Sequence, residues 1–164
     1  MESFIRYLNT PKLLISELFS LFSVVTFPNN QCTGSSSTSS TPVYGTCYSS
    51  TECTNKGGTV DGNCAAGFGV CCTFLVSTCG SSVSQNCTYI QNPSYPSSYT
   101  TAGSCEYSVN PLSSDICQLR LDFDNFDNTD DNDGTCTDSF TVTSGSSRDY
   151  FEFCGLFTDQ HSKY

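Results

Sequence analysis

With 164 residues, the chain has room for one ordinary domain or two small modules, and we expect two modules. Charged residues make up 13% of the sequence and Trp is absent, whereas Ser, Thr, Tyr, Gly and Cys are abundant, which favours strands and turns over helices. The formal net charge of -10 repels nucleic acids and anionic membrane surfaces, so polyanionic partners are disfavoured and we expect no nucleic acid as a partner.

Residues 1–31 contain an apolar run, 13–27, that follows Arg6 and Lys12. A charged start before an apolar run is typical of a signal peptide, but Glu17 interrupts the run and no Ala-x-Ala-like cleavage site follows. The run is too short and too polar for a membrane span. Three interpretations stay open, namely a poor signal peptide, an amphipathic segment of the mature protein, and an incomplete N-terminus, which we slightly favour.

Twelve cysteines begin after this segment. So many thiols in a short chain indicate disulfides and an oxidising compartment, from which we infer an extracellular, secreted protein. A structural zinc site would need paired Cys-x2-4-Cys or mixed Cys/His sets, and the only histidine is His161, near the C-terminus. We therefore expect no structural metal.

Residues 32–72 hold the first six cysteines, with turn signals at 57–58, 61–62 and 67–69. A Ser/Thr-rich stretch, 33–42, has almost nothing to bury and is expected to be a solvated loop. The pattern predicts a compact, disulfide-stapled module. Its cysteines alone permit 15 pairings.

The segments GTC (45–47), EC (52–53) and CAAGFGVCC (64–72) resemble a clip-like module of the kind placed ahead of arthropod proteases and related secreted proteins. The resemblance rests on six cysteines that end in an adjacent pair. It implies three disulfides: Cys32–Cys71, Cys47–Cys64 and Cys53–Cys72.

Residues 79–164 change to short strands separated by turns. Leu119, Leu121 and Phe123 alternate with polar residues, which predicts a half-buried antiparallel strand. Residues 73–78 form a short, fairly apolar connection to the first module. Further strands are expected at 88–90, 105–109 and 139–142.

The order of motifs in this second half resembles a CUB domain. The matching segments are 79–80, the Asn-Pro-x-Tyr-Pro turn within 92–99, 105–107, 121–127, 136–142 and 153–155. Tyr107 stands where the family often has Trp. The resemblance implies a β-sandwich that binds proteins or glycans outside cells and does no chemistry itself.

The same resemblance implies two disulfides, Cys79–Cys105 and Cys136–Cys154. Cys87 and Cys117 are additional, and we expect them to pair with each other, although Cys87–Cys105 with Cys79–Cys117 stays an alternative. The fold class is therefore mainly β, a small disulfide-stapled module followed by an antiparallel CUB-like β-sandwich. The sandwich is expected to lack its last strands at the C-terminal end. Two alternatives stay open: the chain is an incomplete product, or the sandwich closes by recruiting other elements, such as the N-terminal apolar run.

The acidic stretch 122–133 is the strongest lead to a ligand, because clustered carboxylates suit Ca²⁺. Asp127, Asp130 and Asp138 are the candidates. The resemblance implies a glutamate where Thr129 stands, so the family's calcium site is not expected to be intact. We favour a solvated acidic loop and assign no cofactor.

Other candidate sites are few. Asn86 begins the glycosylation sequon Asn86-Cys87-Thr88, and a cysteine at its middle leaves occupancy open. His161 has no Ser or Cys nucleophile near it in sequence and is expected to be exposed rather than catalytic. No catalytic residues are assigned.

We expect a secreted, non-enzymatic binding module for extracellular proteins or glycans. Two alternatives stay open. One is the non-catalytic N-terminal part of a secreted serine protease, and the other is a disulfide-rich protease inhibitor or venom component.

Overall fold

In this computed structural model, the described residues are 2–7, 24–37, 42–128, 135–144 and 150–164, and they are mainly β, as expected. A helix and a 3-10 turn, α1 (Ser50–Asn55) and η1 (Ala65–Gly67), lie in the first module. The strands are β1 (Glu2–Tyr7), β2 (Gln31–Thr33), β3 (Tyr44–Tyr48), β4 (Thr59–Cys64), β5 (Gly69–Val76), β6 (Ser82–Val83), β7 (Thr88–Gln91), β8 (Ser108–Val109), β9 (Leu119–Asn125), β10 (Asp127–Asn128), β11 (Phe140–Thr143), β12 (Tyr150–Phe153), β13 (Gly155–Leu156) and β14 (Gln160–Lys163).

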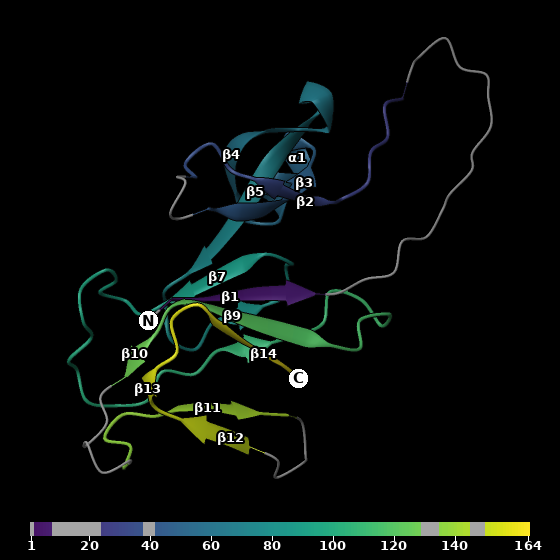
Figure 1. Ribbon diagram of the computed structural model, residues 1–164. Coiled ribbons are helices and arrows are strands. Elements are labelled where there is room, and N and C mark those ends of the chain that lie inside the picture. Colours follow the sequence, from purple (N-terminus) through teal and green to yellow (C-terminus); the bar gives the residue numbers. More distant parts are fainter. Residues whose placement is uncertain (1, 8–23, 38–41, 129–134, 145–149) are drawn as a thin grey trace.

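One sheet runs through both modules in the order β14-β9-β1-β7-β5-β3-β2, and β4 also pairs with β5. Figure 1 shows the first module, with β2, β3 and β4, above the strands β7, β1, β9 and β14, and the β11–β12 hairpin below these strands. The described strand pairs are antiparallel except β5–β7 and β6–β8. The two modules therefore share a sheet.

Strand β5 makes this connection. Its first half pairs with β3 and β4, and its second half, from Phe74 to Val76, pairs in parallel with β7. Residues 73–76, expected to connect two modules, instead continue the strand. In this stretch Phe74 is buried, whereas Leu75 is 61% exposed.

The first module is closed around buried cystines. Cys53, Cys72 and Phe74 pack with Tyr48 in one cluster. Gly58 allows the chain to pass close to this cluster, because a Cβ at that position would collide with the Sγ of Cys72 and with the ring of Phe74. In so small a module, disulfides supply stability that the limited apolar core cannot.

Helix α1 begins with a capping box. The Ser49 hydroxyl accepts a hydrogen bond from the Glu52 amide at 3.2 Å, and the Ser49 amide donates to the Glu52 carboxylate at 3.1 Å. These hydrogen bonds, the side-chain bond to Ser49 first, lower the pKa of Glu52. The box satisfies backbone donors that a six-residue helix would otherwise leave to water.

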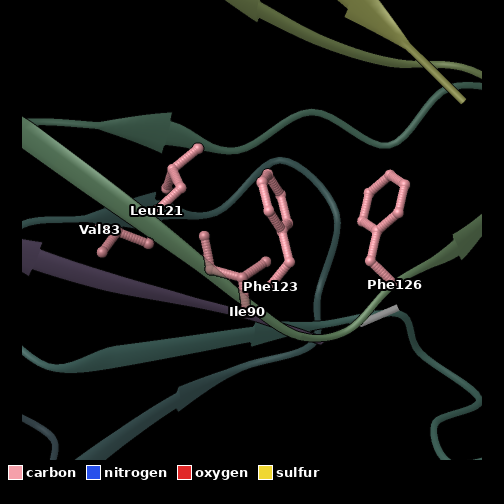
Figure 2. Close-up of a cluster of buried hydrophobic side chains, with 5 residues drawn as sticks. All are labelled: Val83, Ile90, Leu121, Phe123 and Phe126. Atoms are coloured by element: carbon pink, nitrogen blue, oxygen red, sulfur yellow. The ribbon is translucent and has the colours of Figure 1, made fainter. Parts of the chain in front are cut away.

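The second module is built around a phenylalanine cluster. Leu121 and Phe123 of β9 are buried beside Phe126, with Val83 and Ile90 next to them (Figure 2). The hairpin of β11 and β12 covers this face, and its rings meet those of β9 edge to face, with Phe123 and Phe140 at 5.8 Å and 89°. Two layers enclose one apolar core, as in a β-sandwich.

The predicted alternation of β9 is confirmed. Leu121 and Phe123 face the core, whereas Arg120 and Asp122 lie on the other face and form a bidentate ion pair, with Nη2 to Oδ1 at 2.6 Å.

The N-terminal strand β1 lies between β7 and β9, antiparallel to both. The Phe4 side chain is buried, with its ring 4.7 Å from that of Tyr89 and 6.0 Å from that of Tyr44. A recruited element thus completes the sheet, but it precedes the apolar run 13–27, of which residues 13–23 lie outside the described residues. The ring of Phe4 joins side chains from both modules.

We predict that Phe4→Ala lowers the free energy of unfolding by about 3 kcal/mol, because it removes a buried ring at the junction of the two modules. Denaturant unfolding measures this difference. Phe68→Ala is the control, because that ring is largely exposed and its loss should change stability by about 0.5 kcal/mol or less. Equal effects of the two substitutions would contradict the placement of β1.

We predict that Ser49→Ala lowers the free energy of unfolding by about 1 kcal/mol at neutral pH, because it removes the helix cap. The lowered pKa of Glu52 contributes stability that is present above its unfolded-state value, about 4.3, and is lost as pH falls through the lower folded-state value. The difference from wild type should therefore shrink in acid.

Denaturant midpoints at neutral pH and at about pH 3 test this, with the exposed neighbour Thr51→Ala as control. A difference for Ser49→Ala that stays constant with pH would show that the Glu52 carboxylate takes no part in the cap.

Candidate binding surface

Five disulfides cross-link the segments that carry the exposed surfaces. They are the five pairs that the two resemblances imply: Cys32–Cys71, Cys47–Cys64, Cys53–Cys72, Cys79–Cys105 and Cys136–Cys154. Each lies within one module, so the modules are joined by β1 and β5 rather than by a covalent cross-link.

The expected Cys87–Cys117 disulfide is not formed. Cys117 is a free, exposed thiol in the segment before β9, whereas Cys87 is fully buried beside Phe4 and Tyr89. The expectation was wrong because pairing the two leftover cysteines of a module takes no account of burial. One of them lies in the junction between the modules and the other on the surface.

The first module carries an open groove of about 380 Å³. Phe27, one of its lining residues, packs against Gly69, where a Cβ would come within 2.8 Å of the Phe27 ring and of the Sγ atoms of Cys47 and Cys64. None of the residues that line the groove is charged: Val25, Thr26, Phe27, Pro28, Asn30, Gln31, Cys47, Cys64, Ala65 and Phe68.

One wall of the groove is a constrained turn. Ala65, Ala66 and Gly67 all have positive φ, at 49°, 55° and 92°. Two alanines in the left-handed region cost about 1–3 kcal/mol each, so the turn persists because its surroundings hold it. Cys64, at its start, is bonded to Cys47, and Phe68, at its end, is 63% exposed. The turn signal 67–69 was visible in the sequence, but the groove beside it was not.

A second hollow, of about 200 Å³, lies between β12 and the C-terminal strand β14. Its lining residues are Phe151, Phe153, Ser162, Lys163 and Tyr164. The Phe151 and Tyr164 rings are 5.9 Å apart and inclined at 59°, and Phe151 is 60% exposed. The hollow is therefore lined largely by aromatic rings.

The acidic candidates are not brought together where the structure describes them. Asp127 is exposed in β10, and Asp138 is exposed before β11. Asp130 lies outside the described residues. Among the described ranges, no three His, Cys, Asp or Glu side chains are grouped as a metal site would require. The expected solvated acidic loop, with no cofactor assigned, stays a prediction.

The sequon at Asn86 lies at the junction of the modules. Asn86 is half-buried, and its carbonyl accepts a 3.3 Å hydrogen bond from the Thr46 hydroxyl. The Thr88 side chain is buried, and its hydroxyl donates to the Gln85 carbonyl at 2.7 Å. Glycosylation of Asn86 stays a prediction, and the folded chain leaves this sequon little access.

Two other sequence candidates are located. His161 is exposed in β14, opposite Asp122 of β9. Tyr107 packs against the phenylalanine cluster, and its hydroxyl donates to the Gln91 carbonyl at 3.2 Å. Burial, and to a lesser extent Tyr99, raises the pKa of Tyr107. Tyr107 is thus a core residue, which agrees with its position where the family often has Trp.

Comparisons with known proteins agree with this architecture. The family model of the CUB domain matches residues 79–163, which is more than half of the chain. No curated protein and no solved structure matches the chain. Within the described ranges, no helix is long and apolar enough to cross a membrane.

We predict that the native protein contains a thiol that reacts rapidly with a water-soluble thiol reagent, because Cys117 is exposed. Cys117→Ser should abolish this fast labelling, which mass spectrometry of the labelled peptide measures. Ser81→Ala, at a half-buried serine of the same module, should leave the labelling unchanged. If the wild type is not labelled rapidly, the assignment of Cys117 as a free, exposed thiol is wrong. The expected Cys87–Cys117 disulfide would then be supported instead.

Proposed function

The chain belongs to the CUB domain family through residues 79–163, and on this basis we propose that it is a secreted, non-enzymatic binding protein for an extracellular protein. CUB domains are typically non-catalytic modules that mediate binding between proteins. Five disulfides in a small chain support an oxidising, extracellular location, since thiols in the cytosol are kept reduced.

The observation that carries the proposal is the groove of the first module with Phe68 beside it. A mostly exposed phenylalanine is costly in water, and burying such a ring in a partner contributes about 1.5–3 kcal/mol. The disulfide of Cys64 and the constrained turn hold Phe68 in place, so little conformational entropy is lost on binding.

The groove also indicates the chemistry of the partner. Its lining is uncharged although the chain has a net charge of -10. A partner that inserts an apolar side chain here gains from apolar contact rather than from ion pairing. We therefore expect binding at this groove to depend weakly on salt concentration.

Full-length protein, immobilised and exposed to extracellular fluid from its own source, tests the proposal. We predict that Phe68→Ser weakens binding of the retained partner about 30-fold, because it removes a central aromatic anchor. Leu156→Ser is the matched control, since Leu156 is 76% exposed but lies in the other module. Dissociation constants for wild type and both variants measure the effect.

Equal loss with both variants would show nonspecific apolar capture and overturn the proposal for this groove. Steady chemical conversion of the partner by the purified wild-type protein would overturn the non-enzymatic assignment.

A further inference from the structure

We propose that the partner at the groove of the first module is a second copy of this chain, with the Phe68 ring of each copy inserted into the groove of the other. This inference rests on the proposed function, because it names a partner for the same groove. Three observations carry it: the distribution of charge between the two modules, the position of Phe68 at the groove, and the volume of the groove.

The charge of the chain is concentrated in the second module. Residues 79–164 contain twelve acidic and three basic residues, a net charge of -9, whereas residues 24–78 contain two acidic and one basic residue, a net charge of -1. Two copies with this distribution repel each other least when their first modules meet. Because the residues that line the groove are uncharged, a contact between two grooves places no charged lining residue against another.

Phe68 gives this surface a protruding ring next to a hollow. The ring is largely exposed although Phe68 is one of the lining residues, and Val25, another lining residue, is exposed as well. Exposed apolar side chains that gather at one place mark an interaction site. A two-fold contact between identical chains requires a self-complementary surface, with the inserted group and the hollow that receives it on the same patch. This patch contains both, so one two-fold contact removes two Phe68 rings from water.

The turn that carries Phe68 presents the ring in a fixed position. The Phe68 amide donates a 3.1 Å hydrogen bond to the Ala65 carbonyl, and Cys64, at the start of the turn, is bonded to Cys47. Each copy therefore offers its ring and its groove in the same relative position, and little conformational entropy is lost when they meet.

The groove is large enough for the ring. Its volume is about 380 Å³, whereas an apolar cavity of about 150 Å³ already accommodates benzene. The remaining volume leaves room for atoms of the turn that carries the ring. Asn30 and Gln31 also line the groove and are exposed, so their side-chain amides can hydrogen-bond the backbone of the inserted turn. An apolar centre with polar groups around it is usual for a protein interface.

Sedimentation equilibrium of the purified full-length protein tests the inference without any added partner. Cys117→Ser serves as the background, so that exposed thiols do not cross-link two chains. We predict that the average mass rises from one chain towards two between about 1 and 300 µM, with a dissociation constant on the order of 30 µM, as expected of a small interface.

Phe68→Ser is expected to raise this dissociation constant at least about 30-fold, because both inserted rings are lost. Leu156→Ser, which removes an exposed apolar side chain from the second module, should leave the constant unchanged. The amide spectrum of each variant reports whether it is folded.

Two charge variants of one lining residue test the two-fold arrangement. A two-fold contact repeats any new charge on both sides, so Gln31→Lys alone and Gln31→Glu alone should each associate more weakly than the parent. An equimolar mixture of the two variants should associate about tenfold more tightly than either variant alone, because opposite charges then meet.

A protein that stays monomeric over the whole concentration range would overturn the inference. So would association that Phe68→Ser does not weaken, or that Leu156→Ser weakens equally. A mixture of the Gln31 variants that gains nothing, or an average mass beyond two chains, would overturn the two-fold contact. If the monomeric chain still retains a partner from extracellular fluid through Phe68, the inference fails and the proposed function stands, so the two failures are distinguishable.

Discussion

Burial of strand β7 on both of its faces is the constraint on which the rest of the structure depends. Ile90 enters the phenylalanine core of the second module, whereas Tyr89 points to the first module, where its hydroxyl accepts a 2.7 Å hydrogen bond from the Tyr44 amide. Apolar side chains pack on both faces of this strand, so separating either module from it would expose buried apolar surface to water and cost free energy. The two modules are therefore expected to unfold together.

Because strands join the two modules, each disulfide stabilises only the module that contains it. Each cystine closes one module, while the strands β1 and β5 carry the contact between modules through hydrogen bonds and through the Phe4 ring. The groove beside Phe68 draws its residues from the first module and from none of the junction strands. Binding at this groove therefore need not disturb the junction.

Much of the second module could be predicted from local patterns. The alternation at Leu119, Leu121 and Phe123 placed β9 with its correct face inward, because the side chains of a strand alternate with period two. The resemblances to a clip-like module and to a CUB domain implied five disulfides, and the structure contains all five. The sequence offered no such signal for the groove beside Phe68, since the residues lining it come from separate segments that meet only in the folded chain.

By itself, the sequence determined the mainly β class, the disulfide-rich chemistry and the membership of residues 79–163 in a family of binding modules. Only the tertiary structure decided that β1 enters the sheet between β7 and β9, that β5 serves both modules, and that Cys87 and Cys117 are apart. The physical reason is that local patterns report which face of a strand is apolar. Which strands become neighbours depends on pairing between distant segments, where many registers compete and the burial of rings such as Phe4 decides.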